Sequence, residues 1–216
     1  MKYELVVFDW DGTLLDSAGA IVHAIQASCR DLDLPVPDDS RARHVIGLGL
    51  VDALRHAVPD LLPENYQAMV DRYRSHYLAG DKNLTLFDRV PEMLQRLKAA
   101  GHILAVATGK SRLGLERALD HSGLRPFFQA SRCADECHSK PHPQMLLELM
   151  AEFGIAAEAT VMIGDTSHDM LMATNAGVDG LAVTYGAHPH GDLLEYNPIC
   201  CLHSVEELDR WLQLYA

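Results

Sequence analysis

Short apolar runs alternate with helical stretches along most of this chain, and that alternation limits the fold more than any other feature of the sequence. Four runs have the length and residue types of buried strands, at 5–8, 102–107, 160–163 and 180–184. Helical patterns of about 10–15 residues separate most of them. This arrangement predicts an α/β fold whose core is a Rossmann-like, doubly wound parallel sheet.

The region between the first two runs has a different pattern. Residues 17–80 contain no β-like run, and their helical patterns are short. Ser17 is expected to cap a first helix over 18–32. We therefore predict a helical cap in 17–80, inserted into an α/β core formed by 1–16 and 81–216. Because the insertion directly follows the first strand, we expect it to lie as a lid over the carboxyl edge of the sheet.

Composition narrows the classes of partner. The chain has 216 residues, a formal net charge of −12 and a pI near 5.3. We therefore expect neither a nucleic-acid backbone nor an anionic membrane as a partner. No apolar run approaches transmembrane length, and the first residues lack the pattern of a signal peptide. The five cysteines show no disulfide framework. We expect free thiols and a cytoplasmic protein, and the sequence leaves the oligomeric state open.

Polar residues follow three of the predicted strands. Asp9 and Asp11 follow the first, a Thr-Gly-Lys segment at 108–110 follows the second, and Asp165 follows the third. Parallel packing brings such ends to one edge, where ligands bind in sheets of this kind. Two nearby carboxylates repel unless a positive charge or a shared proton lies between them, and a hard divalent cation meets that need. Two solvated aspartates at a strand end are the alternative, and this first segment alone does not decide between them.

Together with Lys140 and Asp169, these residues resemble the four motifs of the haloacid dehalogenase (HAD) superfamily, in that family's order and over nearly the whole chain. The matching segments are Asp9-x-Asp11-Gly12-Thr13, Thr108, Lys140-Pro141 and Gly164-Asp165-x3-Asp169. The helical insertion resembles a C1 cap. Within the superfamily the chain is most similar to phosphoglycolate phosphatase-type members.

The resemblance implies a Mg2+-dependent phosphatase that acts through an aspartyl-phosphate. Asp9 is then the nucleophile, and Asp11 is the general acid and later the base. The resemblance implies that Mg2+ is bound by the carboxylates of Asp9 and Asp165 and by the backbone carbonyl of Asp11, with water completing the coordination. Asp169 is expected to support this site rather than to bind the ion directly.

The same resemblance implies how the phosphoryl group is bound. Thr108 and Lys140 are expected to act as catalytic and substrate-binding residues, through a hydroxyl donor and a positive charge, and Gly109 as a further binding residue. The expected partner is a small phosphorylated metabolite, and phosphoglycolate fits the resemblance. Three cap arginines are candidates for holding a substrate anion: Arg41, Arg43 and Arg55.

Several reactions share this scaffold. A dehalogenase does not need Asp11, because halide leaves without a proton, so Asp11 favours phosphoryl transfer. A phosphonatase needs a cap lysine for a Schiff base, and no lysine lies between Tyr3 and Asp81. A phosphomutase of the β-phosphoglucomutase type remains open. A non-catalytic regulatory module on the same fold is a further alternative, although the four intact motifs argue against it.

Three weaker features complete the sequence picture. The glycine-containing segment 46–50 is interpreted either as a cap loop that faces the site or as a simple helix break. His188 and His190 are expected close to the active edge. The Gly-Lys-Ser segment at 109–111 resembles the end of a Walker A loop, but the glycine required five positions earlier is Leu104. We therefore assign no phosphate-binding loop there.

Overall fold

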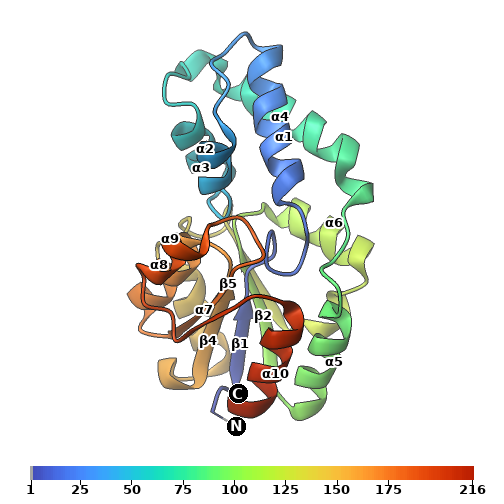
Figure 1. The fold of residues 1–216 in the computed structure, drawn as a ribbon, viewed down its shortest axis with the longest axis vertical. Helices are drawn as coiled ribbons and strands as arrows, with labels where there is room; N and C mark the ends of the chain where they lie inside the picture. The colour runs from blue at the N-terminus through green and yellow to red at the C-terminus, as the bar shows by residue number, and fades with distance from the viewer. Residues whose placement is uncertain (1) are drawn as a thin grey trace.

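The computed structural model describes residues 2–216, and a six-stranded parallel sheet lies at its centre (Figure 1). The strands are β1 (Leu5–Phe8), β2 (Ile103–Thr108), β3 (Ala130–Cys133), β4 (Thr160–Gly164), β5 (Asp179–Val183) and β6 (Cys200–Leu202). Their order across the sheet is β3-β2-β1-β4-β5-β6, and every neighbouring pair is parallel. This is the order of a Rossmann-type sheet, so the predicted α/β fold is confirmed.

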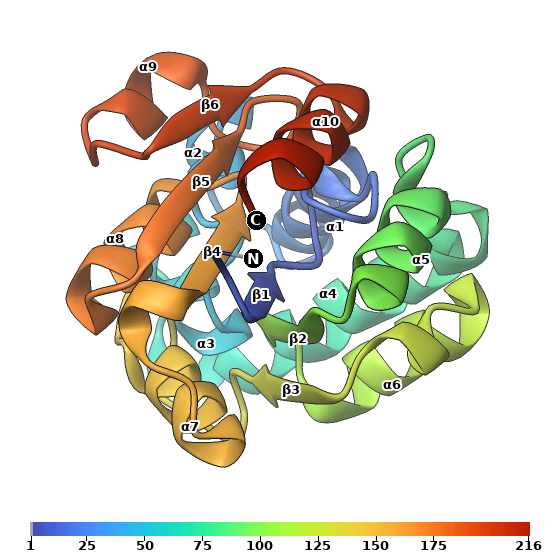
Figure 2. The same ribbon diagram turned by 90° about the horizontal axis from the view of Figure 1, so that it is seen from below.

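Helices cover both faces of the sheet (Figure 2). One face packs against α5 (Val90–Ala100), α6 (Arg112–Ser122) and α10 (Val205–Tyr215), and the other against α7 (Gln144–Phe153) and α8 (Ser167–Ala176). Successive side chains of a strand point to opposite faces. In β1, Val6 and Phe8 therefore join the first hydrophobic cluster, and Leu5 and Val7 the second. Burial on both faces explains why β1 is apolar throughout.

Four helices come from the chain between β1 and α5, and they lie beyond the carboxyl ends of the strands (Figure 1). They are α1 (Ala18–Asp31), α2 (Asp39–His44), α3 (Leu50–Ala57) and α4 (Tyr66–Gly80). These helices share a hydrophobic cluster of their own, which includes Ile25, Leu54 and Met69. The same cluster also contains Ala187, a buried residue from the chain after β5. Across residues 2–216, no helix has both the length and the hydropathy to cross a membrane.

Three local features differ from the sequence expectations. β3 was not predicted, because only Cys133 in it is buried and no apolar run marks it. The five-residue helix α9 (His190–Leu194) was also not predicted. Ser17 precedes α1 as expected, but its side chain does not cap the helix. Its hydroxyl instead donates a hydrogen bond to Asp11 Oδ1 over 2.7 Å, so Ser17 helps to hold Asp11 at the carboxyl edge of the sheet.

Candidate active site

The three polar strand ends are neighbours because β1 lies between β2 and β4. Asp9, the first residue after β1, donates its backbone N–H to the Ile163 carbonyl of β4 over 2.9 Å. The chain then turns at Gly12, where φ is +81°. A β-carbon at Gly12 would collide with the Asp165 carboxylate. Glycine at this turn therefore lets the loop after β1 approach the end of β4.

A buried cluster of three carboxylates forms at this edge. One carboxylate oxygen from each of Asp9, Asp165 and Asp169 lies within 4.8 Å of the others, and all three residues are fully buried. Asp165 is held on both sides. Its Oδ1 accepts a hydrogen bond from Thr13 Oγ1 (2.8 Å), and its Oδ2 accepts one from the Ala187 N–H (2.7 Å). This cluster is the place in the described chain where acidic oxygens could jointly hold a metal ion.

Lys140 links two members of the cluster. Its Nζ lies 2.7 Å from Oδ1 of Asp9 and 2.7 Å from Oδ1 of Asp169, and the side chain is fully buried. The other oxygen of Asp169 accepts hydrogen bonds from the Thr166 N–H (3.1 Å) and from Thr166 Oγ1 (2.6 Å), in a capping box at the start of α8. Asp169 thus has both oxygens engaged by protein donors.

Asp9 differs from its two neighbours in lacking such donors. Neither of its carboxylate oxygens receives a hydrogen bond from any described residue, and Lys140 stands at ion-pair distance only. Burial raises the pKa of Asp9 well above its usual range; the Lys140 charge opposes that rise, while Asp169 and Asp165 add to it. Burial, followed by repulsion from Asp169, raises the pKa of Asp165 to about 7. Unpartnered buried oxygens and crowded acids fit a divalent cation at this cluster.

Asp11 lies outside this cluster. The strand ends at Phe8, and the Asp11 carboxylate turns toward β2, where Lys110 Nζ lies 3.0 Å from its Oδ1. Asp9 and Asp11 both line a cavity of about 790 Å³ between the sheet edge and the inserted helices. Gly109 and Lys110, at the end of β2, line the same cavity. The edge of the sheet therefore forms the floor of a partly open cavity.

Thr108 is fully buried at the end of β2. Its Oγ1 accepts a hydrogen bond from the Lys110 N–H over 3.2 Å, which leaves its own hydroxyl hydrogen free to be donated. Thr108 is not among the residues that line the 790 Å³ cavity, whereas Gly109 is. A β-carbon at Gly109 would collide with the carbonyl oxygen of Leu48. Residues 46–50 also line the cavity, so their interpretation as a loop that faces the site is confirmed.

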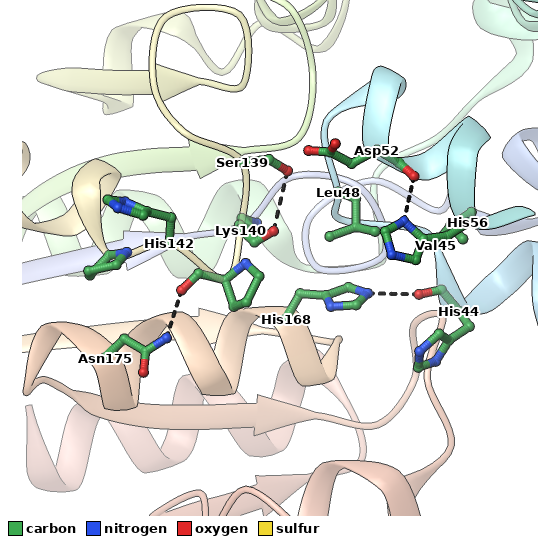
Figure 3. A pocket seen from close by; sticks show the side chains of 12 residues that line it. His44, Val45, Leu48, Asp52, His56, Ser139, Lys140, His142, His168 and Asn175 are labelled. Atoms are coloured by element: carbon green, nitrogen blue, oxygen red, sulfur yellow. Dashed lines mark hydrogen bonds between the residues drawn. The ribbon is translucent and has the colours of Figure 1, made fainter. Parts of the chain in front are cut away.

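A second cavity, of about 580 Å³, shares Val45, Leu48, Asp52 and Ser139 with the first. Figure 3 shows the residues that line it. Figure 3 shows His168 reaching from α8 to the end of α2, where its Nε2 lies 2.7 Å from the His44 carbonyl oxygen. Lys140 is among the lining residues, but none of the three clustered aspartates is. The cavity that contains Asp9 and Asp11 is therefore the better candidate for the reaction.

Comparison with known proteins agrees with this arrangement. A family model described as haloacid dehalogenase-like hydrolase matches residues 6–183, which include every motif residue at the sheet edge. The chain belongs to the haloacid dehalogenase-like hydrolase family. The predicted resemblance is thus confirmed, and the protein is a HAD-like hydrolase.

Two relatives and one solved structure illustrate matches of the HAD-like hydrolase over nearly the full length of both chains. It is 38% identical over 211 residues to the probable phosphatase IndB of Dickeya dadantii, covering 94% of this chain and 91% of that one. It is 30% identical over 220 residues to a phosphoglycolate phosphatase of Colwellia psychrerythraea, covering 95% of each. A crystal structure of a predicted phosphatase from Clostridium acetobutylicum superposes with a TM-score of 0.87 at 27% identity, over 99% of this chain and 100% of that one.

The structure of this HAD-like hydrolase gathers the residues that the sequence singled out. Asp9, Asp165, Asp169 and Lys140 are in mutual contact or close proximity. Asp11, Thr108 and Gly109 occupy the neighbouring strand ends. His188 lies at the edge as expected, where its backbone N–H donates to the Asp165 carbonyl oxygen over 3.3 Å. The roles of these residues remain proposals.

The cap arginines chosen from the sequence are placed differently. Arg41, Arg43 and Arg55 do not line the cavity that contains Asp9. Arg74 of α4 and Arg117 of α6 line it instead. The short helices α2 and α3 carry the first three arginines away from the cavity, and no spacing in the sequence distinguishes the two sets.

Several contacts at the site were missed from the sequence. Thr13, Ser17 and Thr166 donate hydroxyl hydrogen bonds to Asp165, Asp11 and Asp169 respectively, and Ala187 donates a backbone N–H to Asp165. Thr166 carried a signal, because Thr-x-x-Asp is a capping-box spacing. Lys110 also carried one, since it was counted among the polar residues at a predicted strand end, but no contact with Asp11 and no role was assigned to it.

Proposed function

We propose that this HAD-like hydrolase is a Mg2+-dependent phosphatase that hydrolyses a small phosphomonoester, of the phosphoglycolate kind, through an aspartyl-phosphate. The observation that carries the proposal is the Asp9 carboxylate. It lies on the floor of the cavity, fully buried, with neither oxygen hydrogen-bonded and Lys140 Nζ 2.7 Å from Oδ1. A buried anion kept free of donors beside a fixed positive charge is suited to attack an electrophile.

In the proposed reaction an Asp9 oxygen attacks phosphorus, and the bond between phosphorus and the alcohol oxygen breaks. Phosphoryl transfer requires an aligned nucleophile and neutralisation of charge on the phosphoryl oxygens. Lys140 serves the first requirement because its charge favours the ionised form of Asp9 and opposes the rise in the pKa of Asp9 that burial causes. Asp169 serves it indirectly, since it fixes Lys140 Nζ at 2.7 Å.

The donors at the edge fit Mg2+, which prefers carboxylate and carbonyl oxygens. Asp9 and Asp165 would hold the ion through their carboxylates and Asp11 through its backbone carbonyl. We assign Asp169 a supporting role because its Oδ1 is paired with the Lys140 ammonium and its Oδ2 accepts two hydrogen bonds from Thr166, whereas Asp165 contacts only neutral donors, one on each oxygen. When bound, Mg2+ supplies the positive charge that offsets the phosphoryl oxygens and the clustered carboxylates.

Asp11 is the proposed general acid and base. As the ester bond breaks, Asp11 gives its proton to the departing alcohol oxygen, and the resulting carboxylate later takes a proton from the water that attacks the aspartyl-phosphate. The Thr108 hydroxyl retains a free hydrogen for a phosphoryl oxygen, as described above. Gly109 brings the backbone after β2 to the cavity wall.

The inserted helices form the proposed cap, which we assign to 17–80, with 1–16 and 81–216 as the catalytic core. Their separate hydrophobic cluster supports this division, and their position over the cavity would limit the access of water. The cavity of about 790 Å³ is larger than a two-carbon acid needs. Similar proteins include enzymes named phosphoglycolate phosphatase, 5'-nucleotidase and pyrophosphatase, so candidate substrates span that range of sizes.

The test is release of inorganic phosphate from a panel that runs from phosphoglycolate through sugar phosphates to nucleoside monophosphates and pyrophosphate, with and without Mg2+. We expect Mg2+-dependent hydrolysis, and a loss of more than about 1,000-fold in kcat for Asp9→Asn. Asp192→Asn, an exposed aspartate in α9, is the matched control. Undiminished hydrolysis by Asp9→Asn would exclude Asp9 as nucleophile. Interconversion of sugar phosphates with little free phosphate would indicate the mutase reaction instead.

A further inference from the structure

Lys110 is a second lysine at the sheet edge with a largely buried side chain, and the reaction outlined above does not use it. It lies two residues after Thr108, its side chain is only 11% exposed, and its Nζ points into a small cluster of oxygens. The nitrogen lies 3.0 Å from Asp11 Oδ1 and donates a hydrogen bond to the Tyr77 hydroxyl over 2.9 Å. It also lies 4.8 Å from the centre of the Tyr77 ring.

These contacts fix one oxygen of Asp11 and leave the other available. Oδ1 receives both Lys110 Nζ and a hydrogen bond from Ser17 Oγ over 2.7 Å. Among the side chains and backbone groups that the structure describes, none donates a hydrogen bond to Oδ2. Because Asp11 lines the cavity, Oδ2 is the oxygen that can exchange a proton with a bound ester. Two donors on Oδ1 therefore orient the carboxylate for proton transfer at Oδ2.

Tyr77 connects this arrangement to the inserted helices. It belongs to α4, whereas Lys110 follows β2 in the α/β part of the molecule. The ring of Tyr73, one turn earlier in α4, stacks on the Tyr77 ring with a centroid distance of 6.0 Å and an interplanar angle of 18°. The stacked pair fixes the position of the hydroxyl. The Lys110 ammonium is therefore shared between Asp11 and a residue of the insertion.

The charge at this position is stable. Burial alone would lower the pKa of Lys110, but the neighbouring Asp11 carboxylate, together with Tyr77 and Tyr73, more than offsets burial and raises it. Burial raises the pKa of Tyr77 to about 12. Lys110 is thus an ammonium and Tyr77 a neutral phenol at neutral pH. The contacts of Lys110 Nζ with Asp11 Oδ1 and with the Tyr77 hydroxyl argue for positioning rather than for direct proton transfer.

We propose that Lys110 is a positioning residue that orients the Asp11 carboxylate for proton transfer and, through Tyr77, makes that orientation depend on the seating of the insertion over the sheet. This inference rests on the proposed phosphatase function. Lys110 itself forms and breaks no covalent bond. The proton that reaches the departing alcohol oxygen comes from Asp11, as the bond from Asp9 to phosphorus forms and the ester bond breaks.

The test compares aryl and alkyl phosphate esters whose leaving groups differ in basicity. A nitrophenolate leaves without a proton, whereas an alkoxide needs one from a general acid. The quantity measured is kcat/KM, because it reports the steps up to release of the alcohol. For Lys110→Met we expect a loss of about tenfold on p-nitrophenyl phosphate and of on the order of 100-fold or more on alkyl phosphates. A residue that only supports the fold would lower all esters by the same factor.

Three further variants complete the design. Tyr77→Phe keeps the ring and removes the hydroxyl, so we expect a smaller loss with the same dependence on the leaving group. Lys110→Arg keeps the charge and should restore part of the activity on alkyl esters. Lys98→Met, an exposed lysine in α5, should match the wild type on every ester. Thermal unfolding of each variant shows whether it is folded, and if Lys110→Met is not, Tyr77→Phe decides the outcome.

Equal losses on all esters for Lys110→Met would overturn the positioning role. A Tyr77→Phe variant that matches the wild type across the series would overturn the link to the insertion. Failure of the phosphatase function itself would look different. In that case the wild type would release no phosphate from any ester, or Asp9→Asn would be as active as the wild type, whatever Lys110 does.

Discussion

The site has two halves with different construction, and each is centred on a lysine whose side chain is fully or largely buried. Lys140 binds Asp9 and Asp169 at 2.7 Å each, and all three residues come from the α/β part of the molecule. Lys110 binds Asp11 at 3.0 Å and Tyr77 at 2.9 Å, and Tyr77 belongs to the inserted helix α4. The side with Asp9 is therefore complete without the insertion, whereas the side with Asp11 is not.

The difference suggests that the two halves have different tasks in the proposed reaction. The Asp9 side must keep an anion and its counter-charges in place throughout the reaction, and full burial with short ion pairs meets that need. The Asp11 side must meet an alcohol that enters and leaves, and it opens onto the cavity. A contact from the insertion at that side allows its geometry to follow cap movement.

The largest expected effect comes from Lys140→Met. It leaves the buried carboxylates of Asp9 and Asp169 without their shared cation, and breaking a buried ion pair from one side costs about 3–5 kcal/mol. For a chain of this size the midpoint of thermal unfolding should fall by on the order of 10 °C without divalent cations. Lys110→Met should cost on the order of 1 kcal/mol, because Asp11 keeps Ser17 and borders the cavity. Equal losses in the two variants would contradict the division into halves.

The second prediction concerns stabilisation by Mg2+, and it distinguishes ligands that bind the ion through a side-chain carboxylate from those that bind it through a backbone carbonyl. Mg2+ at about 100 times its dissociation constant should stabilise the wild type by about 2.7 kcal/mol, which raises the unfolding midpoint by about 5–10 °C. Asp165→Asn should abolish the shift, since it removes a proposed ligand. Asp11→Asn should retain it, because only the Asp11 backbone carbonyl is assigned to the ion. A shift that survives Asp165→Asn would place the ion elsewhere, and one lost in Asp11→Asn would make that side chain a ligand.

The two halves also differed in how far they could be predicted from the sequence. The Asp9 side could be predicted from the ends of the strands. Apolar runs indicated β1 and β4, and the polar residues that follow them lie together because the two strands are adjacent and parallel. Lys140 was expected from the family resemblance, not from its own surroundings. The edge strand β3 was missed because burial on both faces, the cause of the apolar runs elsewhere, is absent there.

The Asp11 side was harder to predict for physical reasons. The contact between Tyr77 and Lys110 joins residues 33 positions apart across a helix and a strand, and no spacing rule encodes it. One contact on the Asp9 side was equally hard to predict, because the Ala187 N–H that holds Asp165 is a backbone group, which any residue could supply. Ser17 was predicted as a helix cap, since a serine before a helix usually acts in that way. Only the turn after β1 brings its hydroxyl within 2.7 Å of Asp11.

The smallest of the expected effects concerns how closely the insertion approaches the end of β2. A β-carbon at Gly109 would collide with the carbonyl oxygens of Leu48 and Gly47, and these backbone atoms cannot rotate away as a side chain can. Gly109→Ala should therefore shift the 46–50 loop away from the sheet edge. We expect kcat/KM to fall by about 10- to 100-fold, because a displacement of about 1 Å at a catalytic site can cost that much.

The same substitution should leave the Asp9 side intact, so the stabilisation of Gly109→Ala by Mg2+ should equal that of the wild type. Gly19→Ala is the matched control: its β-carbon meets no atom within 4 Å, and alanine in helix α1 should stabilise the chain by about 0.5–1 kcal/mol without loss of activity. Loss of the Mg2+ shift in Gly109→Ala would mean that the insertion also maintains the Asp9 side. The two halves would then form a single unit, and Tyr77 would not be the specific link between them.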